Sequence, residues 1–298
     1  MNPAQAPNLI IAGVTKGGTT SIFTYLGDHP DICGSTKKEL RYFMSLRYGK
    51  ELGNFENYVE NFAACTAEKY RMEASPGYIY GGKTVADAIR ATLPSPKVLL
   101  ILREPVGRLH SFFRSHQNKF VIDTRLSFEQ YIDQCQKTDL ADIGEDNYVM
   151  FGVAAGCYSD YLEPWIEIFG DDLQICFFDD FLADQVGFLQ SICAKLGIDG
   201  SFYDTYTFTV ENKSVEYKSL TLQRVAVTLN NWLERFFRQR PQLKRFLRSA
   251  YYRLNGQSKQ AMDHQARLRL QEYYEPYNAK LKEVLERHGY PSDRVWRY

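Results

Sequence analysis

The stretch Ile10-Ile11-Ala12-Gly13-Val14-Thr15-Lys16-Gly17-Gly18-Thr19-Thr20-Ser21 decides the fold that this sequence predicts. An apolar run leads through a glycine pair, flanked by hydroxyl side chains and one lysine, into residues with helical spacing. Because glycine lacks a Cβ atom, the chain can close around an anion there, and the unpaired N–H groups of the new helix can point at it. We therefore predict a strand, an anion-binding loop and a helix, in this order.

The position of the lysine distinguishes this loop from the Walker A loop of nucleoside-triphosphate-binding proteins. Gly13 and Gly18 have the Walker spacing, but Thr19 stands where the Walker lysine belongs, and Lys16 precedes the glycine pair. This stretch alone leaves two alternatives open: a phosphate site, and a glycine-rich turn with a solvated lysine.

The composition is that of a globular protein without a global charge. The 298 residues are 44% hydrophobic and 14% aromatic, which is enough for a sizeable core. The 36 basic and 36 acidic residues cancel, so the positive field that marks nucleic-acid-binding proteins is missing. We expect no nucleic-acid partner, and any anion site must be local.

The sequence shows neither a membrane span nor a metal-ligand pattern. No apolar run approaches the roughly 18 residues that span a bilayer, and residues 1–8 lack the charged start and apolar core of a signal peptide. The six cysteines form no Cys-x-x-Cys pair and no cysteine–histidine cluster with zinc spacing. We expect a cytoplasmic protein with reduced, mostly buried thiols and no metal ion.

Three apolar runs and a shorter strand that ends at Pro76 predict a parallel sheet with helices on both faces, and hence an α/β protein. The predicted strands are residues 8–14, 70–76, 97–102 and 173–178. Helical spacing follows from Thr19 to Gly27, from Val106 onward, and over residues 270–285 near the C-terminus. No glycine/serine linker and no repeat divides the chain, so we expect one domain over residues 1–298.

A second candidate phosphate site follows the strand at 97–102. Arg103 stands at the strand end, where ligand crevices of open α/β sheets lie, and Ser111 comes two helical turns later. A guanidinium binds phosphate oxygens at two points, and a hydroxyl completes the shell. The alternative is an Arg103–Glu104 ion pair with Ser111 facing water.

A charge cluster at Lys37-Lys38-Glu39-Leu40-Arg41-Tyr42-Phe43 carries a candidate general base. Glu39 lies between cations that, together with burial, can set its pKa for taking a proton from an acceptor. The alternative is a solvated surface loop. His110 and His116 lie near the second phosphate motif and are the next candidates for a base.

The two phosphate motifs and their separation resemble those of the sulfotransferases, which use 3′-phosphoadenosine 5′-phosphosulfate (PAPS). Within that superfamily, residues 38–43 are similar to the matching stretch of the heparan sulfate sulfotransferases and their bacterial relatives, in which the glutamate is the catalytic base. The resemblance continues through Gly156-x-Tyr158-x-x-x-Leu162-x-x-Trp165 and through Tyr273-Tyr274-x-Pro276-Tyr277-Asn278. It covers nearly the whole chain except about residues 215–265.

This resemblance implies a three-layer, P-loop-NTPase-like fold with a central parallel sheet, flanking helices and a helical C-terminal part. It implies cofactor contacts from residues Lys16, Gly17, Gly18, Thr19, Thr20, Ser21, Arg103 and Ser111 and catalytic roles for Glu39 and Lys16. Ala74 follows Glu73 where heparan-type enzymes have a lysine, and this departure puts in doubt any carry-over of their sugar specificity. The usual Lys-Gly-Arg loop is replaced by Glu211-Asn212-Lys213-Ser214, which makes Lys213 a further cofactor-binding candidate.

Residues 215–265 are predicted to form a helical insertion. Leu222, Val225 and Leu229 recur at helical spacing, and a second stripe includes Leu247 and Leu254; we expect both stripes to be core. The segment 235–253 is strongly basic. A solvated helix face and an acceptor-binding or membrane-surface patch both explain that charge.

The sequence therefore predicts a metal-independent sulfotransferase that uses PAPS and releases 3′-phosphoadenosine 5′-phosphate (PAP). The acceptor is expected to be a carbohydrate, a glycolipid or a small-molecule alcohol. Two alternatives are a P-loop kinase, which the missing Walker lysine disfavours, and a non-catalytic nucleotide-binding or scaffold protein of the same fold.

Overall fold

β1 (Leu9–Gly13) is the central strand of a five-stranded sheet with the order β2-β3-β1-β4-β5. Its neighbours are β3 (Tyr70–Ala74) and β4 (Lys97–Leu102), and β2 (Ile32–Gly34) and β5 (Leu173–Phe177) form the edges. All four pairings are parallel, and every residue of β1 is buried. The four predicted strands are confirmed, and β2 was missed.

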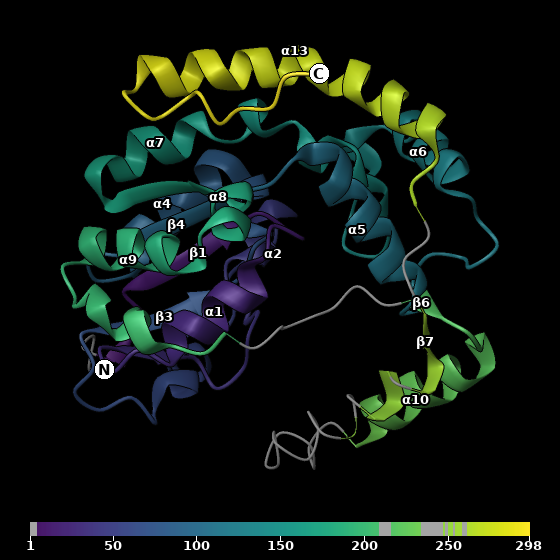
Figure 1. Cartoon of the computed structure of the whole chain (residues 1–298). Coiled ribbons are helices and arrows are strands. Elements are labelled where there is room, and N and C mark those ends of the chain that lie inside the picture. Colours follow the sequence, from purple (N-terminus) through teal and green to yellow (C-terminus); the bar gives the residue numbers. More distant parts are fainter. Residues whose placement is uncertain (1–4, 209–215, 234–246, 248–249, 253, 258–260) are drawn as a thin grey trace. The chain divides into compact units, whose positions relative to one another are not determined.

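The computed structural model describes residues 5–208, 216–233, 247, 250–252, 254–257 and 261–298 (Figure 1). Its contacts divide the chain into two compact units. The first holds Met1–Arg108, Ala154–Asn212 and Leu270–Tyr298, and the second holds Leu109–Val153 and Lys213–Arg269. The prediction of one domain over residues 1–298 stays a prediction.

Helices cover both faces of the sheet in the first unit. On one face, α1 (Thr19–Gly27) and α9 (Gln185–Leu196) pack through Ile22 and Leu189 onto Leu9, Ile11 and Ile101 of the strands. On the other face lie α4 (Gly82–Thr92) and α7 (Glu163–Phe169), which contact one another (Figure 1). The expected α/β class with a covered parallel sheet is confirmed.

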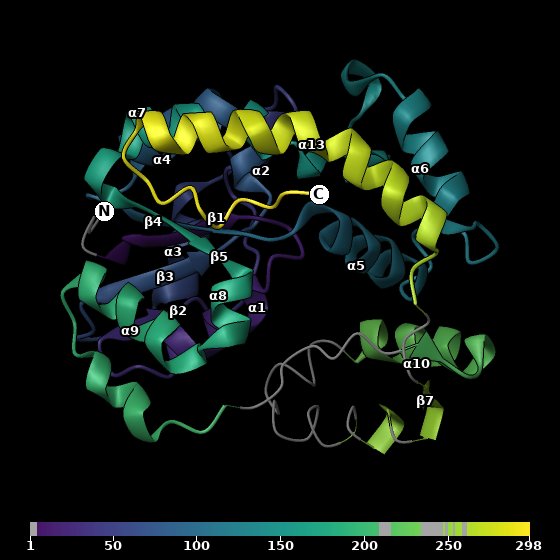
Figure 2. The same cartoon turned by 45° about the horizontal axis from the view of Figure 1, so that its top comes forward.

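The predicted C-terminal helix is α13 (His264–Arg287), which from Leu270 onward belongs to the first unit. Leu270, Tyr274 and Leu281 are buried, as their spacing predicts. α13 lies along α7 (Figure 2), and Arg287 forms an ion pair with Glu163 of that helix. Short helices α2 (Met44–Arg47), α3 (Phe55–Val59) and α8 (Phe178–Ala183) complete this unit.

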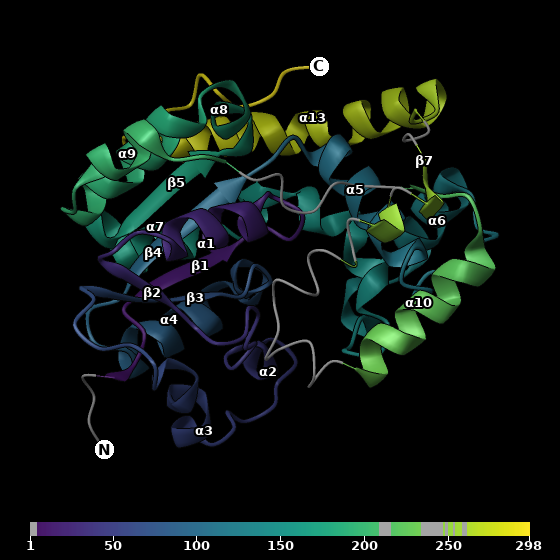
Figure 3. The same cartoon turned by 60° about the horizontal axis from the view of Figure 1, so that its bottom comes forward.

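The second unit contains most of α5 (Pro105–Gln117), α6 (Phe128–Lys137) and α10 (Leu220–Trp232), seen in Figure 3. The two-residue strands β6 (Glu216–Tyr217) and β7 (Gly256–Gln257) pair antiparallel. Phe113 of α5 stacks on Tyr131 of α6 with ring centroids 5.1 Å apart. The amide of Gln223 donates to the carbonyl of Asn118 and so joins α10 to the chain that follows α5.

Five members of the two predicted apolar stripes are exposed where the structure describes their side chains, so at these positions the expectation of core is wrong. Leu222, Val225 and Leu229 of α10 are about half exposed, and Leu247 and Leu254 are exposed as well. α10 is held to its unit through the buried, hydrogen-bonded Gln223, so helical spacing identified the helix but not its packed face. Most of the basic segment 235–253 lies outside the described residues.

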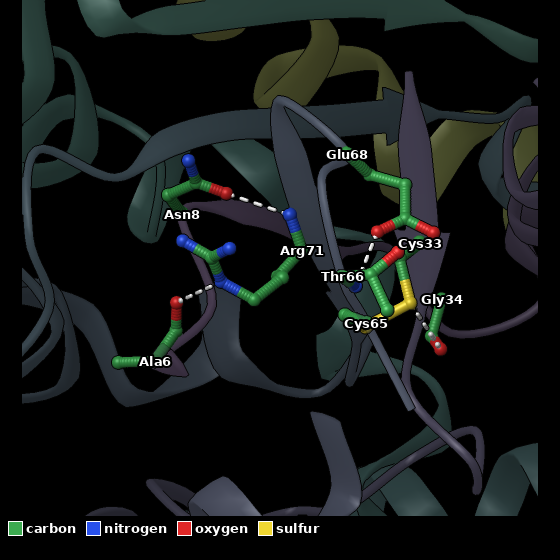
Figure 4. The surroundings of a disulfide bond; sticks show 8 residues. All are labelled: Ala6, Asn8, Cys33, Gly34, Cys65, Thr66, Glu68 and Arg71. Atoms are coloured by element: carbon green, nitrogen blue, oxygen red, sulfur yellow. Dashed lines mark hydrogen bonds between the residues drawn. A yellow bond between two sulfur atoms is a disulfide. The ribbon is translucent and has the colours of Figure 1, made fainter. Parts of the chain in front are cut away.

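The expectation of six reduced cysteines is wrong for two of them. Cys33 of β2 and Cys65, in the segment that leads into β3, form a disulfide (Figure 4). Parallel pairing of β2 with β3 brings these two residues together although 32 positions separate them. Cys135, Cys157, Cys176 and Cys193 are buried free thiols, as predicted.

Candidate functional site

The loop between β1 and α1 has a shape that only glycine permits at two positions. Gly18 is the residue before α1 and has a φ angle of 83°, in the left-handed region. A Cβ atom on Gly17 would lie 2.6 Å from the carbonyl oxygen of Ile101, which is backbone and cannot move aside. Lys16 is also left-handed, with a φ angle of 68°. The two glycines are therefore required for the backbone path of the loop and for its packing against the rest of the protein.

The N–H groups of this loop divide into two sets. Gly17 donates to the carbonyl of Val14 and Ser21 donates to that of Gly18. Among the described residues, no acceptor takes the N–H groups of Gly18, Thr19 and Thr20. Three N–H groups at the start of a helix form a site for an anion. The loop therefore fits a phosphate. Of the predicted contacts, Gly18, Thr19 and Thr20 have N–H groups that can donate to it.

Arg103 joins the two predicted phosphate motifs. It follows β4 directly, and its Nη1 donates to the carbonyl oxygen of Lys16 at 2.9 Å. Adjacent parallel strands end at one edge of the sheet, which is why residues 87 positions apart meet here. Burial lowers the pKa of Arg103, and the nearby Tyr158 opposes this shift.

The alternative partner of Arg103 is engaged elsewhere. The carboxylate of Glu104 accepts the N–H groups of Val106 at 3.1 Å and Gly107 at 2.5 Å, and so caps the first turn of α5. The hydroxyl of Tyr298 donates to the same carboxylate. Glu104 therefore caps the N-terminus of α5, and the guanidinium of Arg103 hydrogen-bonds to the loop that contains Lys16.

Phe178 is a residue of this site that sequence reasoning missed. Its ring lies 5.1 Å from the guanidinium of Arg103, a cation–π distance. A Cβ atom on Gly18 would lie 2.1 Å from its Cε2 atom, so the ring packs directly on the glycine loop. The available signal was its position: Phe178 comes directly after β5, as Arg103 comes directly after β4, so both lie at the carboxyl ends of neighbouring parallel strands.

The structure tests neither of the other two predicted cofactor contacts. Ser111 lies in the part of α5 that belongs to the second unit, and it is partly buried. Lys213 lies outside the described residues. Both stay predictions.

Glu39 lies on the loop between β2 and α2, in a left-handed conformation with a φ angle of 63°. Its N–H donates to the carbonyl of Ala74, the residue that ends β3. Its carboxylate is half exposed and contacts the ammonium group of Lys38 at 3.0 Å. A half-exposed carboxylate can accept a proton from a bound acceptor.

A buried polar cluster lies under the Glu39 loop, and sequence reasoning missed it too. The carboxylate of Glu73 is fully buried and accepts hydrogen bonds from the hydroxyls of Tyr58, Ser75 and Tyr78. Burial raises the pKa of Glu73, and the three hydroxyl bonds oppose this shift. The signal in the sequence was a carboxylate near the end of a predicted strand, followed by Ser75 and Tyr78.

The remaining candidates for chemistry are packed side chains. His116 is buried, and its Nδ1 lies 2.8 Å from the carbonyl oxygen of Phe112. His110 packs against the ring of Phe128. Burial raises the pKa of the Cys157 thiol to about 12, so its thiolate is disfavoured at neutral pH. In the described part of the chain, no three potential metal ligands cluster, and no helix is long and apolar enough to cross a membrane.

Known proteins resemble this chain in sequence. No family model matches it. It is 37% identical over 102 residues to the membrane-associated sulfotransferase kil1 of Dictyostelium discoideum, which covers 34% of this chain and 21% of kil1. It is 24% identical over 296 residues to the human bifunctional heparan sulfate N-deacetylase/N-sulfotransferase 2, which covers 96% of this chain and 30% of that protein. The chain thus spans less than a third of the length of these two relatives.

A solved structure resembles the chain over almost its full length. The sulfotransferase from Alicyclobacillus acidocaldarius superposes with a TM-score of 0.68 at 20% sequence identity, over 94% of this chain and 96% of the other. The five-stranded parallel sheet with its flanking helices is therefore the sulfotransferase fold. The chain thus has the fold of this sulfotransferase, and its sequence is similar to that of sulfotransferases.

Proposed function

We propose that the chain transfers the sulfuryl group of PAPS to a hydroxyl or amine of an acceptor and releases PAP. The observation that carries this proposal is the hydrogen bond from Arg103 to the carbonyl of Lys16. This hydrogen bond places the guanidinium of Arg103, which can bind one phosphate, beside the glycine loop, which can bind another. A nucleotide with two separate phosphates, one of them 3′, matches such a pair.

Each residue has a role in this proposal. The loop Gly17–Ser21 holds the 5′-phosphate, mainly through the N–H groups of Gly18, Thr19 and Thr20. Lys16 places positive charge beside the oxygen that leaves, and Arg103 with Ser111 holds the 3′-phosphate. Lys213 is a further candidate for the cofactor. Because the chain's own cations balance the growing charge, we propose no metal ion in this step.

Glu39 is the proposed general base. As the acceptor oxygen or nitrogen bonds to sulfur, the bond from sulfur to the phosphate oxygen breaks, and the acceptor proton passes to Glu39. One relative's name refers to heparan sulfate, so carbohydrates are the first acceptors to test; glycolipids and small-molecule alcohols come next. The activity is tested by incubating the protein with labelled PAPS and such a panel, read by mass shift. Nucleotide binding without transfer would favour a non-catalytic protein, and transfer from ATP would favour a kinase.

The role of Arg103 is tested with the variant Arg103→Ala. Its affinity for PAP should fall roughly 10- to 100-fold, because charged hydrogen bonds to the 3′-phosphate are lost. Its affinity for 5′-AMP, which lacks that phosphate, should change much less. Calorimetry measures both, with Arg103→Lys as the control that keeps the charge but loses the planar fork. Equal losses for the two nucleotides would contradict the assignment.

The role of Glu39 is tested with Glu39→Gln, which keeps the shape of the side chain. Turnover should fall at least about 100-fold, because general-base catalysis is lost. The affinity for PAP should stay within about twofold of the unchanged protein. Turnover near normal would remove Glu39 as the base and direct attention to His110 and His116.

The cytoplasmic location stays a prediction. The reducing conditions of that compartment oppose disulfides, so the Cys33–Cys65 bond gives a direct way to examine it. Thiol trapping in cells would show whether the two cysteines are joined where the protein resides.

A further inference from the structure

Glu73 is a fully buried carboxylate that the proposed reaction does not use. It lies in β3, in the same compact unit as Glu39. Its Oε1 accepts the hydroxyls of Ser75 at 2.6 Å and Tyr78 at 2.8 Å, and its Oε2 accepts that of Tyr58 at 2.5 Å. A charge this deeply buried is retained only when hydrogen bonds compensate it, so all three hydroxyl protons are directed inward.

Two of these hydroxyls also hold the loop that carries Glu39. The N–H of Arg41 donates to the Oγ of Ser75 at 2.9 Å. The N–H of Phe43 donates to the hydroxyl of Tyr78 at 3.3 Å. A hydroxyl has one proton, and once it is committed to Glu73 only lone pairs remain for the loop. Glu73 thereby sets the direction in which both hydroxyls receive the loop.

The loop needs such support because its backbone is strained. Glu39 and Arg41 have φ angles of 63° and 59°, in the left-handed region that side chains disfavour. Residues persist there when the surrounding structure over-determines them. The carboxylate of Glu39 is half exposed and contacts its neighbour Lys38, so the backbone decides where it points.

We infer that Glu73 is a positioning residue for Glu39. Through Ser75 and Tyr78 it holds the backbone of residues 39–43 in the conformation that presents Glu39 to the acceptor. The inference rests on the proposed function, in which Glu39 is the base, and it assigns Glu73 no contact with substrate.

Four variants distinguish a role of Glu73 in positioning Glu39 from a role in the stability of the fold alone. Glu73→Gln removes the charge at equal size, while Ser75→Ala and Tyr78→Phe each remove one link to the loop. Tyr58→Phe is the matched control. The hydroxyl of Tyr58 also donates to Glu73 but, in the part of the chain that the structure describes, accepts no N–H group of residues 39–43, and phenylalanine keeps the ring that stacks on Tyr42. We expect kcat to fall about 10- to 100-fold in the first three variants, with the KM for PAPS within about twofold, since small displacements of a base cost this much. Tyr58→Phe should stay within about threefold.

A double variant shows whether Glu73 acts through Glu39. In the Glu39→Gln background, Glu73→Gln should lower kcat by less than about twofold, because the base is already absent. A further loss as large as in the parent protein would overturn the inference. Normal turnover of Glu39→Gln alone would refute the base, and this inference with it.

Amide hydrogen exchange provides a readout that needs no activity. In Glu73→Gln and Tyr78→Phe, the N–H groups of Arg41 and Phe43 should exchange at least about tenfold faster, while amides of β1 keep their protection. Unchanged exchange at both positions would refute the inference alone and leave the proposed function standing. Should Glu73→Gln fail to fold, Tyr78→Phe and Ser75→Ala carry the same test.

Discussion

Reduction of the Cys33–Cys65 disulfide should destabilise the first compact unit by an amount that its position in the chain sets. The bond closes the segment between β2 and the approach to β3, and this segment contains Glu39. The perturbation is applied in two ways: by dithiothreitol on the unchanged protein, and by the double substitution Cys33→Ser with Cys65→Ser.

The expected magnitude follows from the sequence separation of 32 residues. For a closed loop of this size, the chain-entropy relation gives about 3–4 kcal/mol at 25 °C, because the cross-link restricts the unfolded chain. We expect the folded state to lose little, since backbone pairing also holds β2 to β3. The free energy of unfolding should therefore fall by about 3–4 kcal/mol in the reduced protein.

Equilibrium unfolding in urea measures this change. The reduced protein and the double-serine variant should unfold at the same lower urea concentration, and dithiothreitol should leave the variant unaffected. Thiol counting in denaturant should give four reactive thiols before reduction and six after it. A loss below about 1 kcal/mol, or an equal effect of dithiothreitol on the variant, would refute the reasoning.

Two further predictions concern the glycine loop and the buried carboxylate. Gly18→Ala should lower the affinity for PAP at least about tenfold by calorimetry, because the φ angle of 83° and the ring of Phe178 leave no room for a Cβ atom; normal affinity would show that the loop shape is not required. Glu73→Gln should change how stability depends on pH. Since folding raises the pKa of Glu73 above its ordinary value of 4.5, its contribution is complete below about pH 4.5 and is lost as the pH rises through the folded pKa. The unfolding free energy of the unchanged protein should thus decrease over that window relative to Glu73→Gln, and parallel curves from pH 4 to 8 would contradict this.

A strand was predictable where an unbroken apolar run of about five or more residues indicated that both faces of the sheet are buried. β1, β4 and β5 are such runs, and their sheet follows from them. β2 has three residues, Ile32-Cys33-Gly34, and so short a segment carries no periodic signal. The helix α10 was predictable from its spacing, but its exposed leucines were not, because spacing does not say which face meets the rest of the chain.

The site divides in the same way. The glycine loop between strand and helix was predictable, because adjacent glycines at a strand-to-helix junction favour a tight backbone path. Its role in binding phosphate stays a prediction. Phe178 and Glu73 were not readable, because an aromatic residue and a lone carboxylate fit many environments equally well. Arg103, which lies beside Phe178, comes from the end of a different strand. The hydroxyls around Glu73 belong to Ser75, Tyr78 and Tyr58, which are 2, 5 and 15 positions away, but nothing in the sequence shows that they turn toward its carboxylate.

The sequence by itself determined the parallel sheet, the glycine loop around Lys16 and the displaced lysine that separates this chain from Walker A proteins. Only the tertiary structure decided that Arg103 meets the carbonyl of Lys16, that Cys33 joins Cys65, and that a buried Glu73 underlies the Glu39 loop. The physical reason is that backbone conformation is encoded by neighbouring residues. Hydrogen bonds, disulfides and burial depend on residues that are distant in sequence and meet only when parallel strands align their ends.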